Sequence, residues 1–286
     1  MRNLLSPPKV MTFSATDPTG GAGLQADVLT LASMYCHPIS IATAISVQDT
    51  KGVESLMPLD SKQIKEQAIT VLNDVSVSVF KLGLLGSLEN IRAVADILNS
   101  YPNTPVVIDP IISSGRGDIL MNDEMKEEMI RLLFPKASLI TPNSIEARKF
   151  VCQENESIDD FSIKETVGRL FNLGCKNILI TGGHEQSKDI INTLYLKNGE
   201  IVPFETERFF DEYHGSGCTL ASAVAGFYAQ GYSLREAVFE AVLFTSLALK
   251  NAFNIGEGQL IPDRFHWIFN NSSYEEDENS DNPTRH

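Results

Sequence analysis

Short apolar runs alternate with amphipathic runs along most of the chain, and this alternation is the strongest constraint on its fold. The apolar runs predict strands, and the runs between them place apolar residues at the 3.6-residue spacing of helices. Six or more such alternations predict a mostly parallel central sheet in a three-layer α/β/α fold, with ligands at the carboxyl ends of the strands. The predicted strands are residues 10–14, 37–50, 78–86, 104–112, 137–143 and 176–183.

The predicted helices fill the gaps between these strands, and a change of period marks one exception. Two alternating runs in "NTLYLKNGEIVPFE", joined by residues 197–200, predict an antiparallel hairpin. The run 37–50 is apolar on both faces, which is typical of a buried parallel strand. The predicted helices are residues 24–35, one capped at Asp60 or Ser61 that reaches about Asp74, 88–99, 122–134, 144–152, 163–173, 217–230 and 234–252.

The domain organisation follows from what the chain lacks. We find no internal repeat and no Pro/Gly/Ser-rich linker, so residues 1–269 are expected to form one domain. Residues 270–286 are polar, acidic and short of apolar residues, and we expect this tail to be disordered.

Charge and cysteine content exclude several classes of function. A formal net charge of −14 with no basic patch argues against nucleic acid and anionic membranes as partners. No segment approaches the length of a membrane span. The four cysteines form no CxxC pair, so neither a zinc site nor a disulfide framework is predicted, and a cytoplasmic protein is expected.

Two glycine-rich loops each follow a strand and begin a helix. They are "DPTGGAGLQAD" and "HGSGCTLASA". The first amides of a helix lack backbone partners and carry partial positive charge, so Gly215, Ser216, Gly217 and Cys218 can bind an anion such as a phosphate. A tight loop-to-helix junction, with Cys218 as a small buried residue, explains the second loop equally well from its pattern alone.

The ordered motifs together identify a family. "TDPTGGAGLQAD", "VQDTKGV", "KLGLLG", "VVIDP", "LITPNSIEA" and "HGSGCTLASA" resemble the successive motifs of the hydroxymethylpyrimidine and phosphomethylpyrimidine kinases of thiamin biosynthesis, in the ribokinase-like superfamily. The resemblance covers about residues 10–267. It implies a ribokinase-like fold, a homodimer, and ATP-dependent phosphorylation of the hydroxymethylpyrimidine and then of its monophosphate, with Mg²⁺.

The resemblance also implies which residues contact the pyrimidine and accept its proton. Cys218 stands where most ribokinases have the general base, and a helix N-terminus is expected to favour its thiolate. Gln48 matches the residue that pairs with the pyrimidine, since an amide offers a donor beside an acceptor. Further substrate positions are Asp27, Gly23, Ala15, Ser46 and Leu84; many family members have glycine, valine and methionine in place of the last three.

The nucleotide and Mg²⁺ positions follow the later strands. Asp109 and Glu146 match acidic positions near the phosphates, and hard oxygen ligands suit Mg²⁺, often through water. Asn143 belongs to the same motif, although a helix cap explains it equally well. Thr181 and Gly183 match the turn beside the nucleotide, but several relatives have lysine at Thr181, and the neighbouring His184 is not included among the site residues.

Two alternatives to the pyrimidine kinase remain at this point. A pyridoxal kinase would share the fold and the anion hole, but Gln48 argues against it because pyridoxal-specific relatives tend to have a hydrophobic residue there. A non-catalytic pyrimidine-binding sensor would retain the scaffold, since a fold does not fix a function. The intact "HGSGC" motif with Asp109 and Glu146 argues against the sensor.

Overall fold

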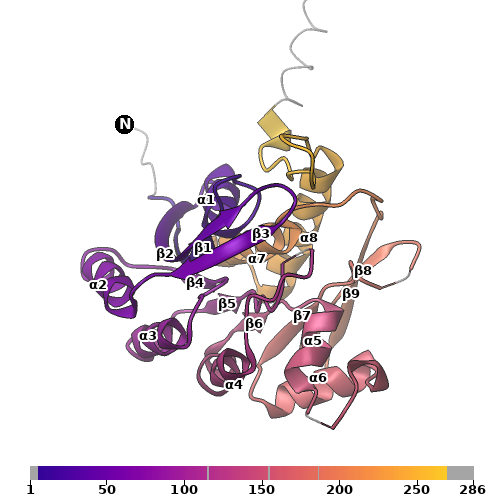
Figure 1. The fold of residues 1–286 in the computed structure, drawn as a ribbon, viewed down its shortest axis with the longest axis horizontal. Helices are drawn as coiled ribbons and strands as arrows, with labels where there is room; N and C mark the ends of the chain where they lie inside the picture. The colour runs from indigo at the N-terminus through magenta and orange to yellow at the C-terminus, as the bar shows by residue number, and fades with distance from the viewer. Residues whose placement is uncertain (1–5, 115, 154, 186, 269–286) are drawn as a thin grey trace, which may run out of the picture.

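A nine-stranded sheet forms the centre of the molecule in the computed structural model, which describes residues 6–268 except 115, 154 and 186. The strand order is β3-β2-β1-β4-β5-β6-β7-β8-β9 (Figure 1). The strands are β1 (Lys9–Thr16), β2 (His37–Gln48), β3 (Val53–Pro58), β4 (Val79–Leu82), β5 (Val106–Ile108), β6 (Leu139–Ile140), β7 (Asn177–Ile180), β8 (Ile190–Leu196) and β9 (Ile201–Thr206).

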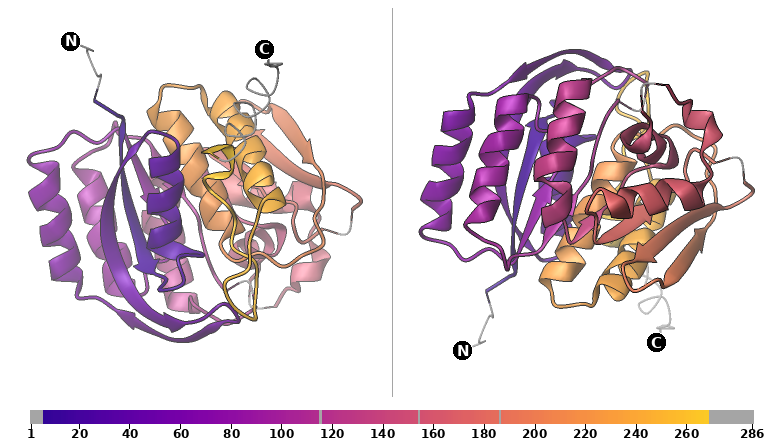
Figure 2. Two further views of the ribbon diagram at one scale, coloured as in Figure 1. Left: turned by 90° about the horizontal axis from the view of Figure 1, so that it is seen from above. Right: turned by 90° about the horizontal axis from the view of Figure 1, so that it is seen from below.

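Helices cover both faces of this sheet, as the two turned views in Figure 2 show. On one face α2–α6 pack over a core that includes Phe13, Phe80 and Phe134, and on the other α1, α7 and α8 cover a second core. The helices are α1 (Gly23–Ser33), α2 (Ser61–Leu72), α3 (Leu88–Asn99), α4 (Asp123–Leu132), α5 (Ser144–Val151), α6 (Ile163–Asn172), α7 (Ser216–Ala229) and α8 (Leu234–Lys250). The predicted three-layer α/β/α architecture is therefore confirmed.

The sheet is antiparallel at both edges, whereas the sequence predicted only the late hairpin of β8 and β9. Strands β1, β2 and β4–β7 pair in parallel, but β3 pairs antiparallel with β2. The expectation that β2 is buried on both faces is wrong, because Ile45 and Val47 on this strand are about half exposed. The predicted tail, residues 270–286, lies outside the described residues.

The helix N-termini fall into two groups. Helices α2, α3, α4, α5, α6 and α8 each begin with a side chain that accepts hydrogen bonds from first-turn amides, and Asp60 and Asn143 are two of these caps. Among the described α-helices, only α1 and α7 lack a side-chain cap. Both follow glycine-rich loops, so their amides remain available to a ligand.

Candidate active site

A cavity of about 540 Å³ opens at the carboxyl ends of the parallel strands. The cavity therefore lies where the sequence analysis expected ligands to bind. The cavity brings together every site residue predicted from the sequence except Asp27. Those that line it are Ala15, Gly23, Ser46, Gln48, Leu84, Asp109, Asn143, Glu146, Thr181, Gly183, Gly215, Ser216, Gly217 and Cys218.

The two uncapped helix starts meet in this cavity. Gly215, the N-cap of α7, has a φ of 79°, and a Cβ there would lie 2.0 Å from the backbone oxygen of Gly21. Gly23 at the start of α1 has a φ of 56°, and its Cβ would lie 2.4 Å from the oxygen of Ala15. Both positions require glycine, because a side chain would force apart the closely packed loops.

A buried carboxylate organises the first loop and joins it to the second. Asp17 accepts hydrogen bonds from the amides of Thr19 and Ala22, at 2.8 and 2.7 Å. Its Oδ2 lies 2.7 Å from Nε2 of His214, which lines the cavity directly before Gly215. Burial opposes ionisation of Asp17, but the bonds from His214 and Ala22 outweigh it and lower the pKa of this carboxyl.

Arg264 forms a second link between the loops. Its buried guanidinium donates to the backbone oxygens of Gly20 and Gly21 and to Oγ1 of Thr219 in α7, at 3.3, 2.5 and 3.1 Å. Burial lowers the pKa of Arg264 to about 10, so it remains charged at neutral pH. The two glycine loops are thus held together by side chains from both ends of the chain.

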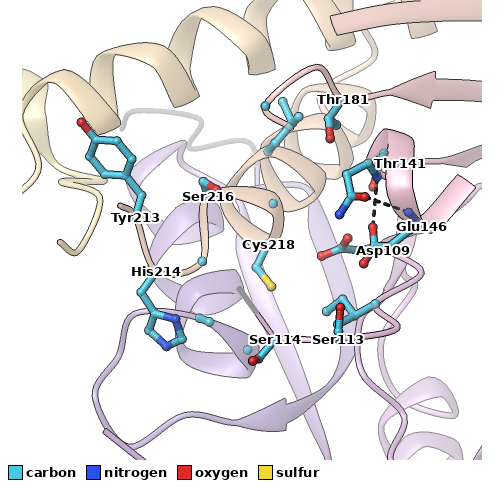
Figure 3. A pocket seen from close by; sticks show the side chains of 18 of the residues that line it. Asp109, Ser113, Ser114, Thr141, Glu146, Thr181, Tyr213, His214, Ser216 and Cys218 are labelled. Atoms are coloured by element: carbon cyan, nitrogen blue, oxygen red, sulfur yellow. Dashed lines mark hydrogen bonds between the residues drawn. The ribbon is translucent and has the colours of Figure 1, made fainter. Parts of the chain in front are cut away.

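The thiol of Cys218 lines the cavity although only 7% of the residue is exposed. Figure 3 shows its sulfur and the carboxylate of Asp109 facing one another. The expected stabilisation of the thiolate is not found: burial, and next the negative charge of Asp109, raise the pKa of Cys218, and Lys81 offsets this only in part. Burial therefore favours the neutral thiol over the thiolate at rest.

Two buried acids stand on the opposite wall. One carboxylate oxygen of Asp109 has no hydrogen-bond partner among the described residues, and burial raises the pKa of this group. Glu146 accepts from the amides of Asn143 and Ile112, at 3.0 and 3.3 Å, and burial with the charge of Asp109 raises its pKa to about 8. Asn143 and Glu146 also form the capping box of α5. Both therefore have a structural role as well as a place in the cavity.

These acids are suited to a hard cation, although they do not form a closed metal site. In the described ranges, no three His, Cys, Asp or Glu side chains are grouped as metal ligands. The unpartnered oxygen of Asp109 and the nearby Glu146 are oxygen donors of the kind that Mg²⁺ binds together with water and phosphate. The residues present fit a water-completed Mg²⁺ site.

Asp27 does not reach the cavity, which corrects its assignment as a substrate contact. Its carboxylate is fully buried and accepts hydrogen bonds from Thr12 at 2.5 Å, Lys81 at 2.8 Å and Ser222 at 2.7 Å. Burial by itself lowers the pKa of the fully buried Lys81. The negative charge of Asp27 helps to raise this pKa above its ordinary value, so the pair is ionic. We call these four residues the buried polar network, which lies among β1, α1, β4 and α7.

The remaining predicted substrate residues cluster at one end of the cavity. Ser46 donates to the oxygen of Thr16 at 2.7 Å, and the amide of Ala15 donates to the oxygen of Leu84 at 3.0 Å. Gln48 ends β2 beside Val53 of β3, so the strand that the sequence analysis missed supplies part of this wall. Apolar side chains beside one amide form a surface that can accept a flat polar ring.

The other end of the cavity lies beyond the glycine-rich loop that precedes α7. Thr181 follows β7, and its amide donates to the oxygen of Pro142 at 3.0 Å, which places it beside the start of α5. Gly183 and His184 also line the cavity, and Val242 and Leu249 of α8 add an apolar wall. Four further residues line the cavity but were not predicted as site residues: His184, Lys149, Arg116 and His214. A local sequence pattern does not distinguish a residue that lines a cavity from one on the outer surface.

The fold and this site together define a class of small-molecule kinase, and solved structures of such kinases resemble the chain. A pyridoxal kinase from Staphylococcus aureus, in complex with ADP, matches with a TM-score of 0.81 at 28% identity, over 92% of this chain and 95% of that one. A phosphomethylpyrimidine kinase from Clostridium difficile matches with a TM-score of 0.72 at 33% identity, over 85% and 99%. The architecture is that of ribokinase-like kinases.

Sequence comparison then defines the family. The family model described as phosphomethylpyrimidine kinase matches residues 17–263. A hydroxymethylpyrimidine/phosphomethylpyrimidine kinase of Staphylococcus aureus is 32% identical over 259 residues, which cover 90% of this chain and 93% of the relative. One from Haemophilus influenzae is 34% identical, over 87% and 94%. The chain belongs to the phosphomethylpyrimidine kinase family.

No helix among the residues of the described ranges is both long enough and apolar enough to cross a membrane.

Proposed function

We propose that this protein transfers the terminal phosphate of ATP to 4-amino-5-hydroxymethyl-2-methylpyrimidine and then to the resulting monophosphate, as its relatives' names describe. The observation that carries the proposal is the meeting of two uncapped, glycine-rich helix starts in one cavity with Cys218, Asp109 and Glu146. Such an arrangement suits phosphoryl transfer, which depends mainly on positioning and on stabilising negative charge.

The amides at the start of α7 bind the migrating phosphoryl group in this proposal. Gly215, Ser216, Gly217 and Cys218 present this uncapped turn to the cavity, and the partial positive charge of the helix end stabilises the added negative charge. The His214–Asp17 contact and Arg264 hold the turn in place before substrate arrives. Preorganised donors of this kind need no rearrangement during the reaction.

Cys218 takes the proton of the substrate hydroxyl. Since the resting thiol is protonated, it must lose its own proton, and the facing carboxylate of Asp109 accepts it. In a loose transition state the acceptor hydroxyl loses its proton late, so the thiolate is needed only as transfer proceeds. Gln48, with Ala15, Ser46 and Leu84, holds the aminopyrimidine at the other end of the cavity.

Mg²⁺ bound near Asp109 and Glu146 would neutralise phosphate charge. The region assigned to the nucleotide is lined by Asn143, Thr181 and Gly183.

We also propose that the protein is a cytoplasmic homodimer, and the family resemblance supports this proposal. Analytical ultracentrifugation of the purified protein tests the dimer, and a single species at the mass of one chain would contradict it.

The direct test incubates purified protein with Mg·ATP and the pyrimidine alcohol, and follows products by mass spectrometry. We expect the monophosphate first and the diphosphate later. Binding of the pyrimidine without any ADP formation would instead support a non-catalytic sensor.

Pyridoxal kinase is the competing activity, because solved pyridoxal kinases match this fold with a TM-score of 0.81. Gln48 supports the pyrimidine, since its amide can pair with an amino group and a ring nitrogen together. Values of kcat/KM for the two substrates decide between them. We expect a preference for the pyrimidine, and Gln48→Met should reduce this preference.

A further inference from the structure

Lys149 is an ammonium in the cavity wall that the proposed chemistry has not used. It lies on α5, three residues after Glu146 and four after Ile145, and the three side chains line the cavity from the same helix face. Within the described chain Lys149 has no ion-pair partner, whereas the adjacent Arg148 pairs with Glu185 at 3.4 Å. The ammonium is therefore available to a ligand.

Apart from Arg116, whose guanidinium donates to the backbone oxygen of Lys51 at 3.3 Å, and two histidines, the surrounding wall is acidic or neutral. Asp109 and Glu146 are buried carboxyl groups, and Thr181, across from the start of α5, carries no charge. Burial raises the pKa of Glu146, and the charge of Lys149 acts in the opposite direction, which places the ammonium within electrostatic range of this carboxyl. A nucleotide polyphosphate entering this region needs positive charge from the protein in addition to backbone amides.

We propose that Lys149 contacts the phosphates of the bound nucleotide and supplies the cation that Thr181 does not. This inference rests on the proposed function as an ATP-dependent kinase. The four-carbon stem allows an ammonium on the second turn of α5 to extend along the wall toward the start of that helix.

The test compares ADP with adenosine, which share a base and ribose but differ in phosphate. Isothermal titration calorimetry on the full chain should give about five- to tenfold weaker ADP binding for Lys149→Ala, with adenosine binding unchanged. The difference should shrink as salt rises, because a partly exposed pair is screened. Lys164→Ala is the matched control, since Lys164 is an exposed lysine on the neighbouring α6 and outside the cavity.

Unchanged ADP affinity in Lys149→Ala would overturn the proposal. Equal losses for ADP and adenosine would also overturn it, because they would indicate a change of shape instead of a lost charge. Thermal unfolding of each variant checks that the fold is intact.

A second variant tests whether positions 149 and 181 serve the same phosphates. Thr181→Lys should restore ADP affinity in the Lys149→Ala background and add much less in the wild-type background. Equal gains in both backgrounds would contradict a shared ligand.

Failure of this inference is distinguishable from failure of the proposed function. If all variants bind ADP alike and the wild type phosphorylates the pyrimidine, only the role of Lys149 is wrong. If the wild type neither binds ADP nor forms phosphorylated product, the kinase proposal itself fails.

Discussion

At the scale of single residues, Cys218 is the proposed proton acceptor, and its surroundings are those of a core residue. It is almost fully buried, and its pKa is raised by burial and by Asp109, yet its sulfur lines the cavity. Sequence reasoning placed the thiol correctly at the helix start. It did not anticipate how deeply the thiol is buried, and burial raises its pKa.

Cys218→Ser should lower kcat for pyrimidine phosphorylation by about 10²- to 10⁴-fold, because a serine hydroxyl is a much weaker acid than a thiol. The KM for the pyrimidine should change little, since Gln48 and the apolar wall are intact. Steady-state kinetics at saturating ATP measures both constants. An unchanged kcat would refute the role of Cys218 as proton acceptor.

Asp17→Asn should destabilise the protein at neutral pH and less so in acid. The lowered pKa of Asp17 means that its ionised form stabilises the fold above the ordinary carboxyl pKa of 3.8, and this contribution is lost as the pH falls below that value. Thermal melts of wild type and Asp17→Asn from pH 7 to pH 3 should therefore converge toward the acid end. A gap that widens in acid would contradict the assignment.

Asp27 shows the limit of sequence reasoning at this scale. A carboxylate four residues after Gly23 looks like a cavity residue, but its charge partner Lys81 is 54 positions away in the chain. Nothing local indicates that Lys81, Thr12 and Ser222 converge on it. The glycines were predictable because a strand–loop–helix pattern fixes where they lie, whereas the pairing of two buried charges depends on the complete fold.

At the scale of elements, most helices could be located from their apolar period and their capping residues. Asp60, Ser87 and Ser162 each cap the helix that follows them. Strand β3 was missed because most of its residues are exposed and it follows a four-residue turn, in which the side chain of Asp49 accepts hydrogen bonds from the amides of Lys51 and Gly52. Its partner β2 looked like a strand buried on both faces, since Ile45 and Val47 are apolar although exposed.

The start of α7 allows a test that separates backbone geometry from ligand contact. Gly215→Ala should destabilise the protein by about 2 kcal/mol or more, because of its positive φ and the clash with Gly21. Gly217 differs on both counts, since its φ is not positive and a Cβ added there would have no atom within 4 Å.

Gly217→Ala should consequently leave stability equal or slightly higher, since alanine favours a helix by about 1 kcal/mol. Its methyl group enters the cavity, so the KM for ATP should rise. Chemical denaturation and kinetics of the two variants check both effects. Equal destabilisation of the two would contradict the geometry of this turn.

At the scale of the whole molecule, the buried polar network joins segments that are far apart in sequence. Lys81→Met should cost about 3–5 kcal/mol, because it leaves the carboxylate of Asp27 buried without a counter-charge. Lys81→Met/Asp27→Asn should recover part of this loss, because no charge is left buried and the amide oxygen still accepts from one of the two hydroxyls that bond the separate oxygens of Asp27, those of Thr12 and Ser222.

Urea denaturation of wild type, both single variants and the double variant measures this coupling. Additive losses would indicate that Lys81 and Asp27 do not stabilise one another.

The three-layer class was predictable at this scale because it depends only on the order of strands and helices. The antiparallel strands at both edges of the sheet and the buried pair of Lys81 and Asp27 were not predictable, because both depend on which distant segments meet.

The contacts of Arg264 have a consequence for how the protein becomes active during synthesis. This residue is among the last parts of the described chain to leave the ribosome, yet it ties the first glycine loop to α7. A nascent chain that stops before it can already form every strand of the sheet and the Asp17–His214 contact, but the second link between its two glycine loops is missing. The proposed phosphate-binding site is therefore fully braced only after Arg264 has been synthesised, later than the strands that support it.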